Sequence, residues 1–344
     1  MSPATNTSAG ALMAAEIAEQ PDVLAGLLAA PEALLEVGAR IAAARPRFVL
    51  IAARGTSDHA ALYAKYLAEV RMQLPVGLAS PSALTVYGAA PDMRDVLFVA
   101  VSQSGRSPDL VDSLSVARAR GAISVTVTND LDSPLAHAAE HAVGIHAGPE
   151  RAVAATKTYT AELLALHLLF GGRDSAREAA PIPDAAAATL GLTPEESLAA
   201  QMGRLRDTER IVVTARGYSY ATAREAALKL METSYLSALA FSGADLLHGP
   251  LAMIDESVPV IAVSSPGLGG EAMRPVLERL TALDAHILRV GADGDLPIAA
   301  HGVPEHLLPI LEILPLQRLA RRLALDRGVD PDRPRALSKV TQTR

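Results

Sequence analysis

The 344-residue sequence contains no cysteine, and aromatic residues make up only 3% of it. Without cysteine the chain has no disulfide framework, no thiolate nucleophile and no cysteine-ligated metal site. Half of the residues are hydrophobic, so alanine, leucine and valine can fill a sizeable core. The length allows two domains of ordinary size.

Long runs of like charge and long apolar runs are also missing. The formal net charge is −7 and no basic block occurs, whereas a nucleic-acid-binding surface favours a basic stripe. Arginine-rich segments such as RLARRLALDR are typical of solvated helix faces. The apolar stretches are shorter than a membrane span, and MSPATNTSAG lacks the basic and apolar regions of a secretory signal. We expect a soluble, cytoplasmic protein that binds neither nucleic acid nor membranes.

Short apolar segments alternate with amphipathic ones along the chain. RFVLIAA (47–53) precedes DHAALYAKYLAEV, and VLFVAVS (96–102) precedes PDLVDSLSVARAR. Strands that alternate with helices in this way predict βαβ units and mostly parallel sheets. Before them, MAAEIAEQPDVLAGLL predicts a helix that is broken at Pro21. The expected fold class is therefore α/β.

This pattern repeats at an offset of 162 residues. RFVLIAARGTS matches RIVVTARGYS, so that Arg54 falls on Arg216 and Ser57 on Ser219. At the same offset DVLFVAVSQSG falls on SVPVIAVSSPG, and AISVTVT falls on DAHILRV. Three segments in register at one offset indicate two tandem copies of one α/β domain.

The two copies are expected to be flanked and joined by other segments. The connection GGRDSAREAAPIPDAAAATLGLTPEES is rich in alanine, proline and glycine. The predicted ranges are a helical lead-in at 1–38, the first copy at 39–172, the connection at 173–197, the second copy at 198–328 and a tail at 329–344.

Polar residues are concentrated in the turn SQSGRS (102–107), where an apolar run ends and a predicted helix begins. In an open parallel sheet, ligands bind beyond the carboxyl ends of the strands, where helix N-termini attract phosphate. Side-chain donors at this point would be Ser102, Gln103, Ser104 and Ser107, with Ser57 after the neighbouring strand. The alternative is that these serines are ordinary turn and cap residues. The second copy has SSPGLG instead, so only the first copy keeps the polar turn.

One helix face and one histidine are further candidates for chemistry. Glu225, Lys229 and Glu232 are spaced i, i+4 and i+7, so they share a helix face. They form either a functional group or an ordinary surface pair of charges. His248 precedes Gly-Pro in a loop, and a lone histidine of this kind is either functional or structural.

The sequence contains no pattern that requires a metal or a cofactor. The histidines lack zinc-binding spacing such as HExxH, no Walker-type Gly-Lys pair occurs, and GLGG at 267–270 is a weak dinucleotide signal. We expect neither metal nor cofactor. Glu150, Arg151 and Lys157 are either a second contact to an anion or plain loop charges.

Several motifs occur in the order of a known family. They are ARGTS, SQSG-x-S, VAATKTYT, ARGYSYATAREAALKLMETSYL, DLLHGPLAMI and RPRALSKVT. Together they resemble the tandem sugar-isomerase (SIS) half of glucosamine-6-phosphate synthase, and they span nearly the whole chain. The resemblance implies two SIS domains with flavodoxin-like sheets. It also implies that the sugar phosphate is bound by Ser57, Ser102, Gln103, Ser104 and Ser107.

The resemblance implies roles for further residues. Backbone groups of Val153 and Ala154 would meet the sugar. Glu232 would move a proton between C1 and C2, with Lys229 one helical turn away. Two more groups complete the implied site, the ring-opening His248, which the family borrows from a neighbouring subunit, and the Schiff-base-forming Lys339. These roles predict a homodimer.

The sequence departs from the synthase at several positions. Arg106, Met231 and Leu247 replace an acidic residue and two lysines, and Asp245 stands for a glutamate. Since there is no cysteine to hydrolyse glutamine, we expect no ammonia release from glutamine. SQSGRSPDL is more similar to the stand-alone SIS-type glucosamine-6-phosphate deaminases, which form fructose 6-phosphate and ammonia. That activity is the leading hypothesis.

Three alternatives use the same residues differently. The substrate could be another amino sugar phosphate, such as galactosamine 6-phosphate or fructosamine 6-phosphate. The reaction could be a stand-alone amination or isomerisation with ammonia from a partner. The chain could also be a non-catalytic sugar-phosphate sensor, although a sensor has no need of Glu232, His248 and Lys339 together.

Overall fold

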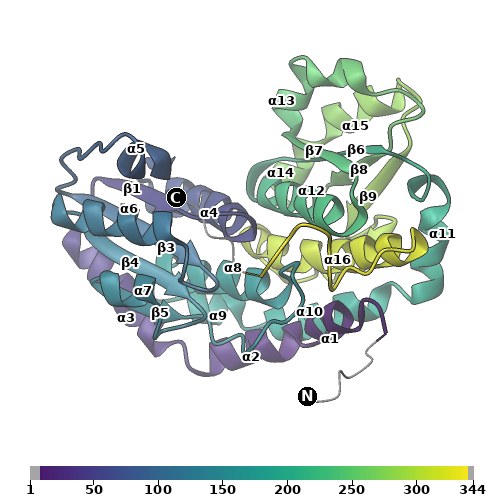
Figure 1. Ribbon diagram of the computed structural model, residues 1–344. Helices are drawn as coiled ribbons and strands as arrows, with labels where there is room; N and C mark the ends of the chain where they lie inside the picture. The colour runs from purple at the N-terminus through teal and green to yellow at the C-terminus, as the bar shows by residue number, and fades with distance from the viewer. Residues whose placement is uncertain (1–7, 340–344) are drawn as a thin grey trace.

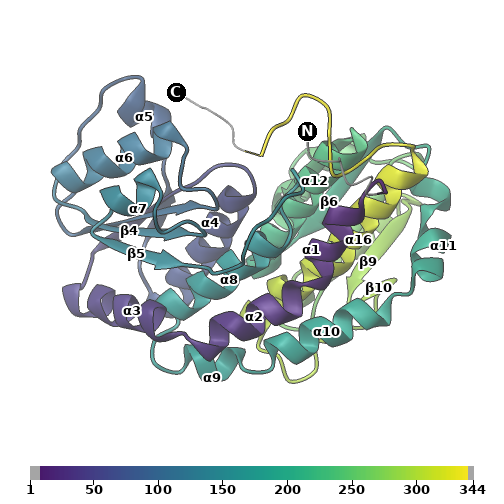
Figure 2. The same ribbon diagram turned by 60° about the horizontal axis from the view of Figure 1, so that its bottom comes forward.

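A computed structural model of the chain describes residues 8–339. It has two lobes, each built on a parallel sheet with helices on both faces (Figures 1 and 2). The N-terminal helices run along the seam between the lobes, and the last part of the chain crosses the same seam (Figure 2). The predicted α/β class is confirmed.

The first lobe contains five parallel strands in the order β2-β1-β3-β4-β5. They are β1 (Phe48–Ala52), β2 (Val76–Leu78), β3 (Val96–Ser102), β4 (Ile123–Thr128) and β5 (His141–Gly144). The central strand β3 is buried from Leu97 onwards, as expected for a sheet covered on both faces. β1 and β3 pair without a shift as far as Ala52 and Ala100, so both end at the same edge of the sheet.

The second lobe repeats this topology. Its strands are β6 (Arg210–Ala215), β7 (Ser237–Ser242), β8 (Val260–Val263), β9 (Ile287–Gly291) and β10 (Leu296–Pro297). Their order is β10-β9-β8-β6-β7, which is the first sheet's order when the strands are matched by position. Both sheets have the strand order of flavodoxin-like folds. The tandem repeat predicted from the sequence is confirmed.

The helices cover both faces of the sheets and fill the seam. Those of the lead-in and the first lobe are α1 (Ala11–Ala18), α2 (Gln20–Ala29), α3 (Glu32–Ala44), α4 (Thr56–Leu67), the π-helix η1 (Ala68–Met72), α5 (Pro81–Thr85), α6 (Pro108–Ala119), α7 (Pro134–Ala138), α8 (Lys157–Phe170) and α9 (Ser175–Ala179). Those that follow are α10 (Ile182–Leu192), α11 (Glu195–Leu205), η2 (Gly217–Ser219), α12 (Tyr220–Ser234), α13 (Gly243–Leu247), η3 (Pro250–Met253), α14 (Leu268–Glu271), α15 (Arg274–Thr281), η4 (Glu305–Leu307) and α16 (Leu308–Asp326).

The expected connection at 173–197 is largely helical. It contains α9, α10 and the start of α11, because its many alanines favour helix and Ile182 and Ala186 are buried in the core. The predicted domain boundaries stay predictions, and those at residues 38 and 198 fall inside α3 and α11. The break near Pro21 is confirmed, since α1 ends at Ala18 and α2 begins at Gln20.

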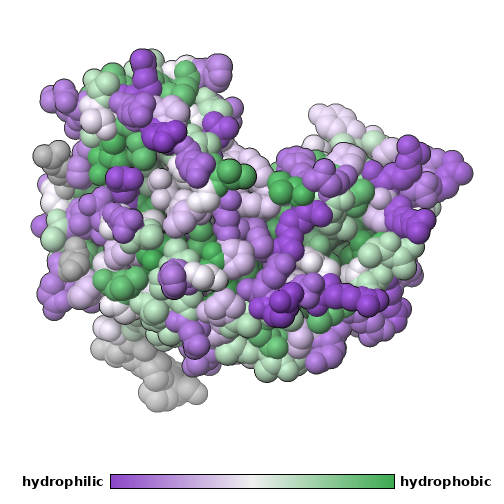
Figure 3. Space-filling model, turned by 180° about the vertical axis from the view of Figure 1, so that it is seen from behind, coloured by the Kyte–Doolittle hydropathy of each residue, from purple (hydrophilic) through white to green (hydrophobic). Residues whose placement is uncertain are grey.

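Helices α4, α8, α12 and α16 pack against one another in the space between the two sheets. All 14 residues of α8 are buried, and α12 packs against both α4 of the first lobe and α16. Seen from behind, the lobes are separated by a notch (Figure 3). Because α12 contacts α4, its side chains reach the edge where β1 ends. In the described part of the chain, no helix combines the length and the apolar character needed to span a bilayer.

Candidate active site

A cavity of about 210 Å³ lies where β1 and β3 of the first sheet end. Its walls come from the turns after these two strands, the loop before α8, helix α12 and the C-terminal segment. Eight residues predicted for the site line it, namely Ser57, Ser102, Gln103, Ser104, Ser107, Val153, Glu232 and Lys339. Residues far apart in the sequence thus meet in one place.

The turn after β3 leaves hydroxyl hydrogens available to a ligand. The N–H of Gly105 donates to Ser102 Oγ at 3.2 Å, and the N–H of Arg106 donates to Ser104 Oγ at 3.3 Å. Since each oxygen already accepts a hydrogen bond, its own hydrogen can be donated to an anion. Gly105 has a φ of 62°, and a Cβ there would lie 2.1 Å from Ser133 Oγ. The turn therefore requires glycine.

Two further donors border this turn. Ser107 precedes the first residue of α6, and its side chain makes no capping hydrogen bond. Arg54 follows β1 and donates through Nε and Nη2 to Asp109 Oδ2 at 2.8 and 2.7 Å. Asp109 is buried, whereas the Arg54 side chain is half-exposed at the cavity wall, which leaves N–H groups for a bound anion.

Helix α12 brings the charged group predicted from its spacing to the same cavity. Lys229 Nζ donates to Glu232 Oε2 at 2.6 Å and lies 3.3 Å from Glu225 Oε1. Glu225 and Lys229 are fully buried, so the interpretation as a surface pair is wrong. Burial by itself lowers the pKa of Lys229, but the carboxylates of Glu225 and Glu232 outweigh it and raise the pKa above its ordinary value. Lys229 thus remains an ammonium beside the partly exposed Glu232.

The buried charges of α12 continue into α4 of the first lobe. Glu225 Oε2 lies 2.7 Å from His59 Nδ1, and Glu225 Oε1 accepts a hydrogen bond from Thr56 Oγ1 at 3.1 Å. Lys229 Nζ donates to the same Thr56 oxygen at 3.1 Å. Because a buried network with its partners in place has few alternative arrangements, it holds Glu232 at the cavity.

The C-terminal segment closes one side of the cavity through Leu337, Ser338 and Lys339. Lys339 Nζ donates to Glu150 Oε2 and to the carbonyl of Ala152, both at 2.7 Å. Burial alone would raise the pKa of Glu150, but Lys339 and hydrogen bonds from the start of α8 lower it below its ordinary value. Glu150 is therefore an ionised partner that holds the tail lysine at the site.

A buried carboxyl group lies behind Ser57. Glu162 of α8 is 1% exposed, and its Oε1 lies 2.8 Å from Ser57 Oγ. Its Oε2 has no hydrogen-bond partner among the described residues. Burial raises the pKa of Glu162 to about 8, against the hydrogen bond with Ser57 and with support from the charges of Glu150 and Glu225. At neutral pH this carboxyl group is protonated.

Three predicted residues do not line the cavity. Lys229 is fully buried and reaches it only through its hydrogen bond to Glu232. His248 is exposed at the C-terminal end of α13, on the second lobe (Figure 1). Ala154 is buried, and its neighbour Ala155 lines the cavity instead. At its cavity, a single chain therefore brings together the hydrogen-bond donors for an anion, Glu232 and Lys339, but not His248.

The three charged residues before and at the start of α8, which the sequence left as either anion contacts or plain loop charges, each have a different partner. Glu150 holds Lys339, as described above, and Lys157 forms an ion pair with Glu19 of the lead-in. The side chain of Arg151 is exposed, and its backbone N–H donates to Glu16 Oε1. Of the three, only Glu150 contacts a residue of the site.

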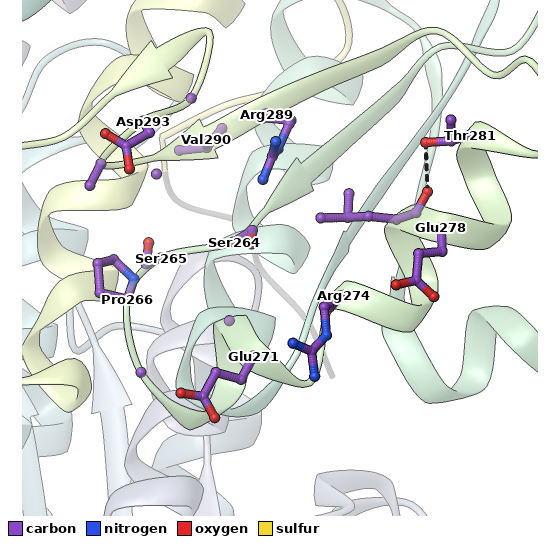
Figure 4. A pocket seen from close by; sticks show the side chains of 16 residues that line it. Ser264, Ser265, Pro266, Glu271, Arg274, Glu278, Thr281, Arg289, Val290 and Asp293 are labelled. Carbon is purple, nitrogen blue, oxygen red and sulfur yellow. Dashed lines mark hydrogen bonds between the residues drawn. The ribbon is translucent and has the colours of Figure 1, made fainter.

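The second lobe has a cavity of about 860 Å³ at the corresponding edge, between the turns after β8 and β9 (Figure 4). Beside it, Glu305 occupies the turn that corresponds to SQSGRS. Its Oε2 accepts the N–H of Leu268 at 3.0 Å, and its Oε1 accepts the N–H of Gly269 at 2.7 Å. A carboxylate of the chain itself thus binds the N–H groups that this turn could offer to an anion.

One group of described residues has the chemistry of metal ligands. Ligand atoms of His167, Glu178 and His306 lie within 4.8 Å of one another. However, Arg71 lies 2.6 Å from His306 Nε2 and donates to Glu178 Oε1 at 2.9 Å. Because its positive charge opposes a metal ion and already pairs with the carboxylate, the group fits an internal hydrogen-bond network better than a metal site.

The architecture and the motifs agree with the comparison to known families. The model of the SIS domain matches residues 44–171 and again residues 204–323. The chain belongs to the SIS domain family. Each match covers one of the two sheets, so this is a tandem SIS protein with one SIS domain per lobe.

Relatives of this tandem SIS protein include sugar-phosphate enzymes. The glutamine–fructose-6-phosphate aminotransferase (isomerizing) of Pyrococcus horikoshii is 36% identical over 305 residues, which cover 85% of this chain and 51% of the relative. The chain thus spans about half the length of the curated relatives it matches. A solved Silicibacter pomeroyi structure, provisionally assigned as a phosphosugar isomerase, is 32% identical with a TM-score of 0.84 and covers 93% of this chain and 99% of its own.

A solved structure with lower identity has the same fold. The glucosamine-6-phosphate deaminase of Thermotoga maritima is 21% identical with a TM-score of 0.79, and the match covers 96% of this chain and all of that one. The likeness extends over both SIS domains. At this identity it shows the shared fold and not a shared reaction.

Four residues at or beside the cavity were not assigned a role from the sequence, namely Arg54, Thr56, His59 and Glu162. The first three belong to the segment ARGTSDH, whose polar residues follow a strand just as SQSGRS does. This position after a strand could have marked Arg54, Thr56 and His59 as candidates for the site. Glu162 had none, because its partner Ser57 is 105 positions away and no spacing rule connects them.

Proposed function

We propose that this tandem SIS protein is an amino-sugar phosphate deaminase that converts glucosamine 6-phosphate to fructose 6-phosphate and ammonia. One observation carries the proposal. Ser57, Ser102, Ser104 and Ser107 of the first SIS domain, here called the hydroxyl cluster, line a single cavity with Glu232 of the second SIS domain. A proton transfer on a sugar phosphate requires hydrogen-bond donors that hold the phosphate and a carboxylate in the same cavity.

In this reaction the hydroxyl cluster binds the phosphate group. Ser102 and Ser104 donate hydroxyl hydrogens, and the N-terminal end of α6 adds its partial positive charge. The sugar then extends toward Val153 and Glu232. Hydrogen bonds to a charged phosphate are stronger than those between neutral groups, so this end of the substrate fixes its orientation.

Glu232 acts as the acid–base group. It removes the proton from C2 of the open-chain aldose while the C1 carbonyl oxygen gains a proton, which gives an enolamine. It then returns the C2 proton to C1 as the amine nitrogen loses a proton, which leaves a hydroxyl group at C1 and an imine at C2. Water adds to C2, and ammonia leaves as the C2 carbonyl of fructose 6-phosphate forms. Lys229 holds Glu232 in place through its 2.6 Å ion pair. The role proposed for Lys339, which lines the same cavity, is contact with the sugar carbonyl.

Ring opening is assigned to His248 of a second copy of the chain. The support is that His248 is exposed and lies outside the cavity of its own chain. Mixing inactive His248→Ala with inactive Glu232→Gln protein is expected to restore activity, because a mixed dimer has one intact site. Mixed dimers without activity would contradict the shared site.

The decisive experiment measures ammonia and fructose 6-phosphate released from glucosamine 6-phosphate. Galactosamine 6-phosphate and fructosamine 6-phosphate are assayed in parallel, and Glu232→Gln is the control. Both products, lost with Glu232, are expected. If another of the three sugars is used instead, the site is a deaminase of a different substrate. Tight sugar-phosphate binding with no ammonia from any of them would overturn the proposal in favour of a sensor.

A further inference from the structure

Ser57 stands between the cavity and a buried carboxyl group. It lies at the start of α4 and lines the cavity, while its Oγ contacts Glu162 Oε1 at 2.8 Å on the side of α8. The proposed reaction assigns Ser57 to the phosphate but gives no role to Glu162. What Glu162 does to the Ser57 hydroxyl therefore matters for binding.

Among the described residues, Glu162 forms no ion pair that would compensate a negative charge. The charged groups around it are Glu150 before α8, Glu225 on α12 and Lys339 in the C-terminal segment. Lys339 is already held by Glu150, and Glu225 is held by His59 and Lys229. A buried carboxylate without an ion-pair partner is strongly disfavoured relative to the neutral acid. The geometry alone thus favours a proton on Glu162.

The hydrogen-bond partners decide which oxygen holds this proton. If it were on Oε2, the O–H group would be buried without an acceptor among the described residues. On Oε1 it is donated to Ser57 Oγ across the 2.8 Å contact. Since an unpaired buried donor is costly, the proton lies on Oε1. Ser57 then accepts from Glu162 and keeps its own hydrogen.

We infer that Glu162 is a positioning residue that donates its proton to Ser57 Oγ and thereby leaves the Ser57 hydrogen free for the substrate phosphate. The inference rests on the proposed function in taking a sugar phosphate as the ligand. When Glu162 loses its proton, Ser57 must donate to the carboxylate instead. The phosphate then loses a donor and faces a negative charge one side chain away, so its affinity falls.

The second SIS domain contains a matched pair without a ligand role. Ser219, the counterpart of Ser57, donates to Glu312 Oε1 at 2.7 Å, and Thr222 donates to Glu312 Oε2 at 2.8 Å. Glu312 is as buried as Glu162, but both of its oxygens accept hydroxyl groups and it lies outside the cavity. Glu312→Gln therefore controls for the loss of a buried carboxyl group on a central helix.

The test is the affinity for fructose 6-phosphate, which has no amine, measured by calorimetry at pH 7.5 and 9.5. Both values lie above the second pKa of a phosphate monoester, about 6. The dissociation constant of the wild-type protein is expected to rise at least about tenfold, because the competent protonated form becomes scarce. In Glu162→Gln the amide donates at both pH values, so the rise is expected to stay below about threefold. Glu312→Gln is expected to follow the wild type.

An equal loss of affinity in the wild type and in Glu162→Gln would overturn the inference. A second readout is measured on the wild-type protein and does not depend on binding by a variant. The ¹³C resonance of the Glu162 carboxyl carbon, assigned by its absence from the spectrum of Glu162→Gln, should titrate near pH 8. Titration near pH 4 would also overturn it. Neither measurement requires turnover, so absent ammonia release would refute the deaminase reaction and leave the role of Glu162 standing.

Discussion

The two SIS domains share one strand order but differ at the turn that follows the third strand of each sheet. In the first domain, the turn N–H groups of Gly105 and Arg106 bind serine oxygens, and a cavity lies beside them. In the second domain, the turn N–H groups of Leu268 and Gly269 bind the carboxylate of Glu305. The backbone offers an anion site twice, and side chains determine what fills it.

This difference explains how the duplicated fold forms one site. A parallel sheet presents strand ends and helix N-termini at one edge in every copy, whatever the sequence. In the second domain, Glu305 accepts the N–H groups at this edge of the sheet. That domain instead contributes the side chain of Glu232 to the cavity, from helix α12, which packs against α4 of the first domain. In the proposed reaction, binding and proton transfer are thereby divided between the two copies.

The largest expected effect is the loss of reaction rate when the carboxylate supplied by the second domain, Glu232, is removed. Glu232→Gln keeps the shape of the side chain but removes the base, so the initial rate of ammonia release should fall by about 10²- to 10⁴-fold. Glu271→Gln, at the larger cavity of the second domain, is the matched control and should retain full activity. Comparable losses in both variants would mean that the two cavities do not differ in function.

The next effect is on stability, through the two buried glutamates. Native Glu162 has a pKa near 8, well above that of an unfolded chain, so the native state holds a proton that the unfolded state releases. Its contribution is present at low pH and is lost as the pH rises toward 8, by at most about 1.4 kcal/mol per pH unit. Urea unfolding between pH 5 and 8 should therefore show a flatter pH dependence for Glu162→Gln than for the wild type.

Glu312→Gln sharpens that comparison. Because Ser219 and Thr222 both donate to Glu312, its charged form is better compensated than that of Glu162. Its substitution should flatten the stability profile less. Equal flattening by the two substitutions would show that the unpartnered oxygen of Glu162 has no energetic consequence.

A smaller effect is expected from the paired serines Ser102 and Ser264, which lie at equivalent positions of the two turns. Ser102→Ala removes one donor to the phosphate, a hydrogen bond to a charged group worth about 1.5–3 kcal/mol, so KM should rise about 10- to 100-fold. Ser264→Ala should leave KM unchanged. Steady-state kinetics with glucosamine 6-phosphate separates KM from kcat, and a rise in both variants would contradict a single phosphate site.

Much of this could be predicted from local pattern. Alternating apolar and amphipathic segments indicated the α/β class, and the repeated ARG-x-S and AVS motifs indicated the duplication. Serine clustering after a strand indicated the turn that lines the cavity, because strand ends and helix starts have their own residue preferences. Each of these signals is either local to one or two elements or the repeat of such a local pattern at a fixed offset.

The rest depends on contacts between distant elements. Glu305 and Glu162 are single carboxylates on a 3₁₀-helix and a buried helix, and no spacing relates them to their partners Leu268 and Ser57, which lie 37 and 105 positions away. For the same reason the spacing left open whether Glu225 and Lys229 are functional or surface charges, since only the packing of α12 on α4 buries them. Tertiary burial decides the chemistry of such groups, and it cannot be read from spacing.

The smallest expected effect tests whether Glu305 stands in for an anion. Glu305→Ala leaves the N–H groups of Leu268 and Gly269 without their acceptor, so the free energy of unfolding should fall by about 1–2 kcal/mol. Urea unfolding measures this loss, and Glu271→Ala, an exposed residue of the same short helix α14, is the control.

Added inorganic phosphate then distinguishes an anion site from a simple cap. If the freed turn binds phosphate as we propose for the first domain's turn, phosphate should stabilise Glu305→Ala more than the wild type, by an amount that grows with the logarithm of its concentration. Equal stabilisation of both proteins would mean that the second turn has lost anion binding altogether. In that case the divergence of the two domains would lie in the geometry of the turn as well as in the side chain that fills it.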